Sequence, residues 1–235
     1  MSLAPAVSAA PLVLGFVTRP GLAELVDGKP VGTYFPIAIA AAEKAGLDIT
    51  LQAVTQPRLM AQIESNQPNY CAIGVFRTPA REASSKFSLP FYRTPRFTVI
   101  ADRHKEAAMR QHKTLITLFH DPQLKMGQIA AYSFGNYIDP LVAAMRGNIE
   151  QFVGTFDQGF AKILAGRFDY IITFPEEFDS WATRSGLEAG RMVRIDYADM
   201  PDGIFRHFMC SRAVDDELLN RLNAGIAALH LKLGP

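Results

Sequence analysis

The side chain best suited to bind a charged molecule is Arg81, which follows Thr78 and Pro79 at the start of a short predicted helix. Threonine is a common helix cap, and proline is favoured at the first helical position. A guanidinium offers paired N–H donors that match the two oxygens of a carboxylate. Arg81 is therefore a candidate anion-binding residue. The alternative is an exposed helix arginine, paired with Glu82 or another nearby acid.

Three aromatic side chains fall at the ends of predicted elements. Phe16 ends the first strand, Tyr34 begins a helix, and Phe76 follows the third strand. Open α/β sheets bind their ligands at the carboxyl ends of the strands. These rings could stack on a flat or cationic ligand there, and the Tyr34 hydroxyl would need a hydrogen-bond partner. Packing in the core is the alternative, especially for the two phenylalanines.

Signals of enzyme chemistry are weak. The five histidines are scattered and have none of the spacings of a metal site. The sequence has no nucleophile elbow and no glycine-rich phosphate loop. His207, Asp202 and Glu176 could gather in one region, but surface or structural roles are expected for them. We therefore predict no catalytic residue, no metal site and no cofactor.

The segments around these candidates alternate between strand and helix patterns. Predicted strands cover residues 11–16, 48–54, 70–75 and 97–101, with helices at 34–45, 57–65 and from Pro79. A second series has strands at 126–131, 169–174, 192–195 and 205–210, and helices at 115–119, 139–146, 156–165, from Pro175 and at 215–233. Such alternation predicts an α/β fold with mainly parallel sheets. The duplication predicts two lobes with a cleft between them.

Composition narrows the class of protein. The 235 residues are 49% hydrophobic and 20% charged, and the formal net charge is +1. These proportions are typical of a soluble globular protein, and the length suits one large domain or two lobes. The near-zero charge argues against a nucleic-acid-binding protein, which would carry a basic excess. No apolar run approaches the roughly 20 residues of a membrane span.

The cysteines and the N-terminus leave alternatives open. Cys71 and Cys210 are too few for a disulfide scaffold and too far apart for a metal motif, so they form either two buried thiols or one long-range bridge. The segment Met1–Ala10 lacks the basic start and apolar core of a signal peptide. It fits a cytosolic protein, or an exported protein whose signal peptide is absent from this chain. The small residues after Leu3 favour export.

Three segments resemble, in order and spacing, motifs of the bacterial extracellular solute-binding proteins, family 3. They are Gly28–Gly32 before a helix, Gly74–Glu82 with the following Phe87–Tyr92, and Leu164–Ile171. The similarity spans nearly the whole chain. It implies a two-lobed periplasmic binding protein fold of type II, with a mainly parallel sheet flanked by helices in each lobe. Two crossing strands would act as hinges between lobe 1, at residues 11–101 plus 203–235, and lobe 2, at residues 102–202.

The resemblance also implies a ligand site in the cleft. Arg81 would bind a carboxylate of the ligand, and Ser133, in a loop of lobe 2, would add a hydroxyl. Arg19 could reach the cleft from a loop of lobe 1, although a surface charge is the alternative. The complete set of expected ligand-binding residues is Arg81, Tyr34, Phe16, Phe76, Thr78, Ser133, Glu176 and Arg19.

Two positions depart from the pattern of amino-acid-binding members. Phe76 stands where such members often have a small polar residue, and Phe174 stands where they often have an aspartate for the ammonium group. A desolvated ammonium ion needs an acceptor or a negative charge. Glu176 or Glu177 could substitute, although both acids also suit the start of a helix. The ligand is expected to be a small polar solute, an amino acid or a related carboxylate, and it could lack the usual α-amino head group.

The resemblance further implies a location and partners. A periplasmic protein of this kind would act as a monomer, deliver its solute to the membrane subunits of an ABC importer, and have no nucleic-acid partner. The strand with Cys210 would lie beside the strand with Cys71, so a disulfide could form in the oxidising periplasm. Two alternatives are a periplasmic enzyme similar to cyclohexadienyl dehydratases and a ligand-sensing module of a signalling partner.

Overall fold

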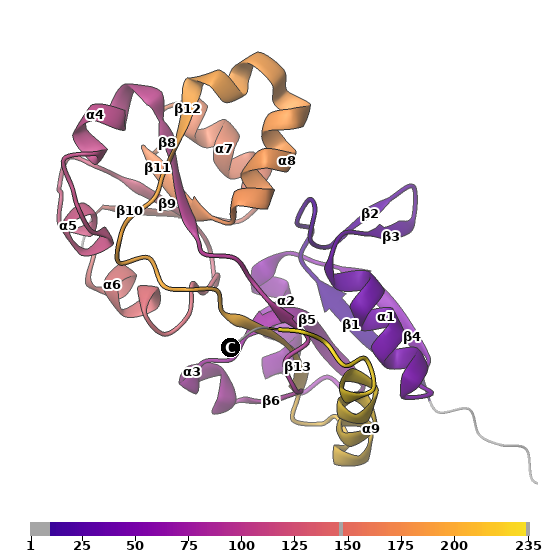
Figure 1. Cartoon of the computed structure of the whole chain (residues 1–235). Helices are drawn as coiled ribbons and strands as arrows, with labels where there is room; N and C mark the ends of the chain where they lie inside the picture. Colours follow the sequence, from indigo (N-terminus) through magenta and orange to yellow (C-terminus); the bar gives the residue numbers. More distant parts are fainter. Residues whose placement is uncertain (1–9, 146–147, 234–235) are drawn as a thin grey trace, which may run out of the picture.

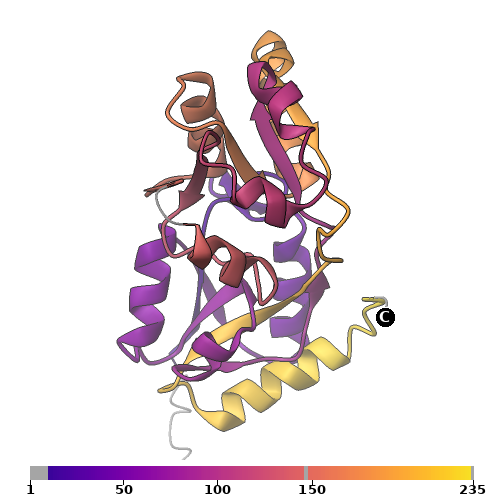
Figure 2. The same ribbon diagram turned by 90° about the vertical axis from the view of Figure 1, so that its left-hand side faces the viewer.

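A computed structural model describes residues 10–145 and 148–233. It contains two large sheets, each with helices packed around it, and a small two-stranded sheet (Figures 1 and 2). The first sheet has the strand order β4-β1-β5-β13-β6, and β7 pairs with β13. Its strands are β1 (Leu12–Phe16), β4 (Ile49–Ala53), β5 (Tyr70–Phe76), β6 (Ser85–Phe87), β7 (Tyr92–Arg93) and β13 (Phe205–Ser211). Strand β1 is parallel to β4 and β5, whereas β13 is antiparallel to β5, β6 and β7.

The second sheet has the strand order β10-β9-β11-β8-β12. Its strands are β8 (Thr98–Asp102), β9 (Met126–Ile129), β10 (Ile149–Phe152), β11 (Tyr170–Thr173) and β12 (Met192–Ile195). Strand β9 is parallel to β10 and β11, and β8 is antiparallel to β11 and β12. The α/β class is confirmed. Both sheets are mixed rather than mainly parallel, because β8 and β13, which begin where the chain crosses between the sheets, run against their neighbours.

Most helices begin and end close to where the sequence predicts. Those of the first lobe are α1 (Tyr34–Lys44), α2 (Gln56–Glu64), α3 (Pro79–Glu82) and α9 (Asp216–Ala227); those of the second are α4 (Glu106–Met109), α5 (Leu115–Phe119), α6 (Ile138–Ala144), α7 (Phe156–Leu164) and α8 (Pro175–Ser185). The Thr155 hydroxyl caps α7 by accepting from the Gln158 N–H, and Gly46 follows α1 with a φ of 61°, as helix ends favour. The last helix, α9, is shorter than the predicted 215–233.

Eight short elements were not predicted from the sequence pattern. They are the strands β6, β7 and β10, the helix α4, the hairpin of β2 (Glu24–Val26) and β3 (Lys29–Val31), and the 3-10 helices η1 (Arg103–Lys105) and η2 (Gly186–Arg191). Predictions that involve residues 1–9, 146–147 and 234–235 lie outside the described residues. Within the described residues, none of the helices has the length and apolar character needed to span a membrane.

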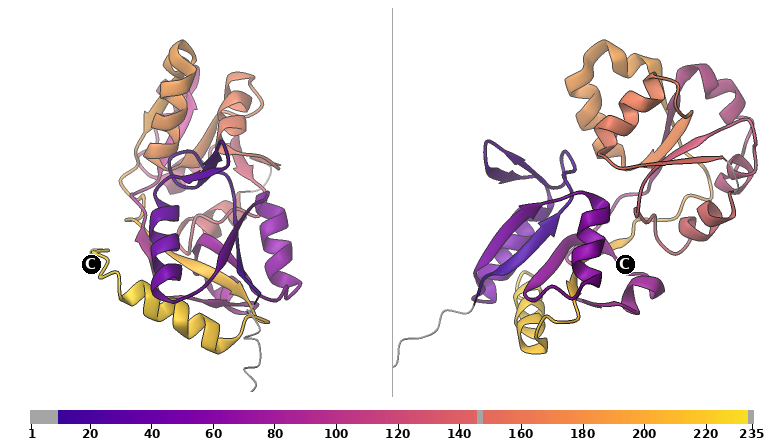
Figure 3. Two further views of the ribbon diagram at one scale, coloured as in Figure 1. Left: turned by 90° about the vertical axis from the view of Figure 1, so that its right-hand side faces the viewer. Right: turned by 180° about the vertical axis from the view of Figure 1, so that it is seen from behind.

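Two segments of chain cross between the sheets, and both are visible from behind in Figure 3. Residues 94–97 join β7 to β8, and residues 196–204 join β12 to β13. The segments lie side by side, since the Thr94 N–H donates to the Ile204 carbonyl at 3.0 Å and the Ile204 N–H donates to the Thr94 hydroxyl at 2.9 Å. The expectation that residues 97–101 belong to the first lobe is corrected, because β8 pairs on both edges with strands of the second sheet.

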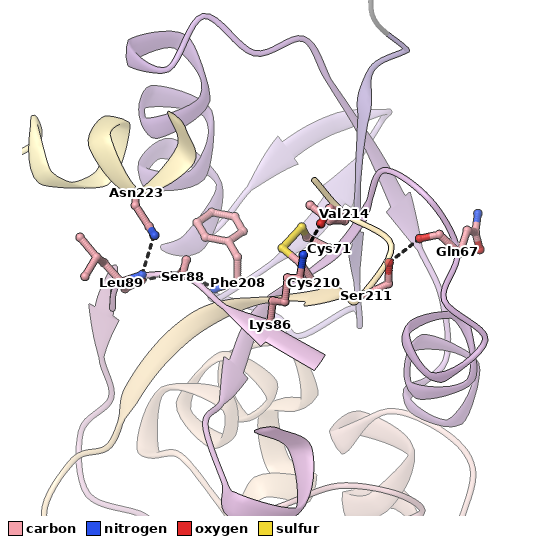
Figure 4. The surroundings of a disulfide bond; sticks show 10 residues. All are labelled: Gln67, Cys71, Lys86, Ser88, Leu89, Phe208, Cys210, Ser211, Val214 and Asn223. Carbon is pink, nitrogen blue, oxygen red and sulfur yellow. Dashed lines mark hydrogen bonds between the residues drawn. A yellow bond between two sulfur atoms is a disulfide. The ribbon is translucent and has the colours of Figure 1, made fainter. Parts of the chain in front are cut away.

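A disulfide joins the neighbouring strands β5 and β13 of the first sheet (Figure 4). Cys71 and Cys210 face each other in the antiparallel register, 139 residues apart in sequence, and both are fully buried. Nearby, Lys86 Nζ donates to the Val214 carbonyl at 2.7 Å, which ties β6 to the segment after β13. The predicted bridge is confirmed.

Aromatic packing continues from one lobe to the other through the first crossing segment. The ring of Phe97 stacks on Phe174 of the second lobe with centroids 4.3 Å apart. It also meets the edge of Phe76 of the first lobe at 6.0 Å. All three rings are buried, so Phe97 links the two cores where the chain crosses between them.

Candidate ligand-binding cavity between the lobes

A cavity lies between the two lobes, beside the carboxyl ends of β1 and β5. Its volume is about 30 Å³. The first lobe contributes Phe16, Val17, Arg19, Ala23, Tyr34, Gln56, Leu59, Ile73, Gly74, Val75, Arg81 and Arg206, and the second lobe contributes Tyr132 and Ser133. This position matches the general rule that open α/β sheets bind ligands at the ends of their strands.

Arg81 lies on α3, and its side chain lines the cavity. Thr78 caps this helix, because its hydroxyl accepts a hydrogen bond from the Arg81 N–H at 3.4 Å, and the guanidinium donates to the Phe76 carbonyl at 3.1 Å. Burial lowers the pKa of Arg81 to about 10, while the carboxylate of Asp139 acts in the opposite direction. The side chain is therefore cationic at neutral pH. Within the described part of the chain, no carboxylate lies within ion-pair distance of it.

Arg206, on β13, is a cavity residue that the sequence analysis missed. It is 3% exposed, and its Nη1 donates to the Gly74 carbonyl at 2.8 Å. Its guanidinium carbon lies 3.5 Å from the centroid of the Phe76 ring, which suits cation–π attraction. Its Nε and Nη2 are buried and have no hydrogen-bond partner among the described residues. The sequence did contain one indication of this role. Arg206 is a charged residue in a strand predicted to lie in the middle of a sheet, and such a strand has no solvated face for a charged side chain.

Tyr34 opens α1 and places a buried hydroxyl in the cavity region. The residue is 2% exposed, and its hydroxyl has no hydrogen-bond partner among the described residues. Gly74 makes room for the ring, because a Cβ at that position would lie 2.4 Å from Tyr34 Cε2, and its φ of +73° also favours glycine. Burial raises the pKa of Tyr34, and the charges of Arg206 and Arg19 act in the opposite direction. The hydroxyl is therefore a protonated donor beside cationic groups.

Arg19 and Glu177 form a buried ion pair between the lobes. Arg19 Nε and Nη2 donate to the two Glu177 oxygens at 2.7 and 2.8 Å, and the side chains are 7% and 1% exposed. The guanidinium carbon lies 5.3 Å from the ring centroids of Tyr132, Phe156 and Phe174. Burial acts to lower the pKa of Arg19, but the Glu177 carboxylate raises it well above the usual value. Arg19 thus lines the cavity, while its charge is neutralised by the second lobe.

Glu176 does not take the position expected for it. It is exposed on α8 and lies outside the cavity lining, whereas the adjacent Glu177 points inward. Glu177 also accepts from the Thr173 hydroxyl at 2.8 Å and from the Phe174 N–H at 3.3 Å. Helix geometry explains the difference, because consecutive residues of a helix face in different directions. Sequence reasoning named both acids but could not tell which one faces the first lobe.

Of the remaining predicted residues, two line the cavity and two lie next to residues that line it. Phe16 lines the cavity and meets the edge of Phe35 at 4.9 Å. Phe76 lies beside Arg206, and Thr78 caps α3; neither is part of the lining. Ser133 does line it.

The Ser133 hydroxyl is already engaged within its own loop. It donates to one oxygen of Asp139, and the other oxygen accepts from the Phe134 N–H at 2.6 Å. The Ser133 oxygen also accepts from the Gly135 N–H at 3.1 Å. Asp139 is therefore held by backbone and hydroxyl donors of the second lobe, in a position where its charge still acts on Arg81.

The charge of the cavity is positive. Its lining, as far as residues 10–145 and 148–233 form it, carries Arg19, Arg81 and Arg206 and no acidic side chain. Glu177 neutralises Arg19, so the charges of Arg81 and Arg206 remain for a ligand. Fixed cations in a cavity with apolar walls attract anionic groups. Among the described residues, no cluster of three metal-ligating side chains occurs.

Comparison with known proteins decides the family. The sequence profile of the bacterial extracellular solute-binding proteins, family 3, matches residues 19–232. The chain belongs to this family. The match covers both lobes and all three motifs noted in the sequence, and it makes this chain a member of a family of exported, solute-binding proteins. No curated protein sequence matches the chain.

Solved structures of similar fold are solute-binding proteins as well. The arginine-, lysine-, histidine-binding protein ArtJ from Geobacillus stearothermophilus has 17% identity and a TM-score of 0.75, with 94% of this chain and 90% of ArtJ covered. An ancestral arginine-binding protein bound to glutamine has 16% identity and a TM-score of 0.72, with 95% and 93% covered. AbpA from Streptococcus pneumoniae, bound to L-arginine, has 16% identity and a TM-score of 0.67, with 94% and 89% covered. At these identities the likeness establishes the fold, the periplasmic binding protein fold of type II.

Proposed function

We propose that this family 3 protein is the periplasmic subunit of an ABC importer and captures a small carboxylate-bearing solute between its lobes. The observation that carries the proposal is Arg81, a cation in the interlobe cavity with no carboxylate at ion-pair distance among the described residues. The importer assignment is supported by a similar structure described as the substrate-binding protein of an amino acid ABC transporter, at 16% identity.

In this proposal Arg81 binds one carboxylate of the solute through paired N–H donors. The second lobe closes over the solute with Tyr132 and the Ser133 loop, which are its two contributions to the lining. Closure removes water and so strengthens each charged hydrogen bond inside the cavity. The lobes turn as units about the crossing segments at residues 94–97 and 196–204, a hinge motion of the kind that closes two-domain binding proteins. The protein works as a monomer.

The proposal is tested on protein from which bound solute has been stripped by unfolding and refolding. A panel of carboxylic acids, amino acids, amines and neutral sugars is screened by thermal shift, and hits are measured by calorimetry. A ligand present at about 100 times its dissociation constant should add about 2.7 kcal/mol of stability. We expect the hits to be carboxylates. Arg81→Ala should weaken their binding by about 10- to 100-fold, the range for a charged hydrogen-bonded contact.

The matched control is Arg58→Ala, because Arg58 is exposed on α2 and outside the lining. It should leave the affinity unchanged. Hits that are indifferent to Arg81, or hits confined to amines and neutral sugars, would overturn the proposal. Incubation of each hit with the protein, followed by NMR of the solute, separates binding from turnover. Recovery of unchanged solute supports a binding protein, and conversion would show an enzyme.

A further inference from the structure

We infer that Arg206 and Tyr34 form a second anion subsite next to Arg81, and that the solute is a short dicarboxylate of the succinate or glutarate type without an ammonium group. This inference rests on the proposed function and names the class of its solute. Three observations carry it. Buried polar atoms of Arg206 and Tyr34 have no hydrogen-bond partner among the described residues, and Arg81 and Arg206 have no carboxylate at ion-pair distance there. The second-lobe acids Glu177 and Asp139 already bind other groups of the protein.

The guanidinium of Arg206 has unused donors. Its Nη1 is taken by the Gly74 carbonyl, but Nε and Nη2 are buried and have no partner among the described residues. A buried donor without a partner is costly, and more so when it is charged. One face of the guanidinium covers the Phe76 ring. The unpartnered N–H donors therefore lie along its edge, which is where a planar carboxylate binds.

The hydroxyl of Tyr34 adds a neutral donor to the same subsite. It is buried and without a partner among the described residues, and the charge of Arg206 acts on it. Gly74 contacts both groups: its carbonyl accepts from Arg206, and its missing Cβ leaves space for the Tyr34 ring. One glycine of β5 therefore contacts both the cationic side chain and the tyrosine ring.

The two free cations lie near enough to affect each other. The charge of Arg206 contributes to the lowered pKa of Arg81, so each makes the other's charge less favourable. A ligand with one negative group for each would relieve this repulsion, whereas a ligand with one negative group leaves a cation unpaired. The cavity is small, about 30 Å³, so a long solute would not fit between lobes placed as they are in this structure.

Among the residues described in the structure, none offers an ammonium group a free acid in the cavity. Glu177 is bound to Arg19 through both oxygens, and Asp139 is bound to Ser133 and the Phe134 N–H. Phe174 is a buried ring stacked on Phe97, and it stands where amino-acid-binding members of the family often have an aspartate that binds the ammonium group. A desolvated ammonium ion would therefore lose affinity relative to the same solute with hydrogen at that carbon.

The test uses solutes that differ by one group, measured by calorimetry on the ligand-stripped full chain. Glutarate is compared with glutamate, which adds only the ammonium, and with butyrate, which lacks the second carboxylate. Succinate and aspartate form a second pair. We expect each dicarboxylate to bind at least about tenfold more tightly than its amino analogue and than butyrate, the effect of one charged contact.

Two variants assign the second subsite. Tyr34→Phe removes only the hydroxyl, and Arg206→Lys keeps the charge but not the planar donor edge. Both variants should weaken the binding of glutarate by about 5- to 50-fold, because one hydrogen bond to a charged group is lost. The affinity for butyrate should stay unchanged. The matched control is Tyr92→Phe, since the Tyr92 ring lies 5.3 Å from that of Tyr34 but outside the lining. It should change neither affinity.

The outcomes separate the two proposals. If no carboxylate binds, or binding ignores Arg81→Ala, the proposed function is wrong. If carboxylates bind through Arg81 but Tyr34→Phe and Arg206→Lys leave glutarate binding unchanged, only the second subsite is wrong. Tighter binding of glutamate than of glutarate would overturn the exclusion of an ammonium group. Tighter binding of phosphate or sulfate than of any dicarboxylate would overturn the solute class.

Discussion

Arg19, Arg81 and Arg206 are one residue type in three environments. Arg19 has a carboxylate from the other lobe, Arg81 has a backbone carbonyl and a distant acid, and Arg206 has an aromatic face and a carbonyl. Which of them can bind a ligand depends on which carboxylates the fold brings within reach. Glu177 neutralises the charge of Arg19, whereas Arg81 and Arg206 have no carboxylate at ion-pair distance among the described residues.

His207, next to Arg206 on β13, gives a residue-scale prediction about pH. Its Nδ1 lies 2.8 Å from the Ser88 carbonyl, and burial lowers its pKa, with that carbonyl acting in the opposite direction. The unfolded chain therefore takes up a proton more readily than the folded protein, so the free energy of unfolding falls as pH decreases through the ordinary histidine pKa of about 6.5. We expect His207→Gln to remove this component, measured by urea unfolding between about pH 8 and pH 5.5.

The control for this experiment is the exposed His104→Gln variant, which should keep the wild-type dependence. A parallel pH dependence for wild type and His207→Gln would contradict the prediction. The comparison is made between variants, because other groups titrate equally in both.

At the scale of elements, the two crossing segments are packed backbone to backbone. Gly203 lies so close to Thr94 that a Cβ there would be 1.6 Å from the Thr94 carbonyl oxygen. Hydrogen bonds between Thr94 and Ile204 hold the same contact. The two connections therefore form one paired unit, and a hinge motion must bend both together.

Gly203→Ala should separate this pair. Backbone cannot move aside as a flexible side chain does, so we expect a loss of about 1–3 kcal/mol or more in the free energy of unfolding, the range for overpacking. Urea unfolding at constant pH measures it. Gly190→Ala is the matched control, because a Cβ at Gly190 meets no atom within 4 Å. Equal stabilities of the two variants would contradict the close packing of the segments.

The disulfide between β5 and β13 gives a second prediction at this scale. Replacing Cys71 and Cys210 together by alanine should lower the free energy of unfolding by about 4–5 kcal/mol on the chain-entropy argument for a loop above 100 residues. For a chain of this size that corresponds to a fall of roughly 8–20 °C in Tm. Calorimetry of the variant and of reduced wild type should agree. Free labelling of both thiols without a reductant would contradict the bridge itself.

Local patterns predicted most of these elements but not their pairing. Helix α5 and strand β12 have the bounds expected from capping, proline and apolar periodicity, because these signals act over a few residues. The sheet membership of β8 could not be read in the same way, since it depends on partners about 70 and 90 residues away. Arg81 was predicted through a local motif. Arg206 was missed, and Glu177 could not be distinguished from Glu176, because their roles arise only when β13 and α8 are placed beside the other elements.

At the scale of the whole molecule, the chain itself bridges its two lobes. The Arg19 side chain of the first lobe enters a ring of Tyr132, Phe156 and Phe174 and binds Glu177 of the second. This contact requires no solute. It therefore links the two lobes directly, through an ion pair that belongs to the protein itself.

Glu177→Gln should open the molecule. It leaves the Arg19 charge buried without a counter-charge, and breaking one partner of a buried pair typically costs about 3–5 kcal/mol. Part of that cost is avoided if the lobes separate and hydrate Arg19. We therefore expect a larger radius of gyration by small-angle X-ray scattering, together with a lower free energy of unfolding by urea.

The neighbouring Glu176→Gln is the matched control, because Glu176 is exposed and should change neither quantity. The double variant Arg19→Met with Glu177→Leu should recover much of the stability, since apolar residues of similar size replace the pair. An unchanged radius of gyration and stability in Glu177→Gln would contradict a bridging role.

Cys71 and Cys210 bracket every strand of the second sheet, from β8 to β12. The second lobe is therefore a covalent ring closed at its base by a sulfur–sulfur bond. A protease that cuts once inside this ring, for example at the exposed Val153, would produce a nicked protein whose two fragments stay linked. Such a protein would run as one species without reductant and as two with it, so a single cleavage in the second lobe would leave the particle whole as long as the disulfide stays oxidised.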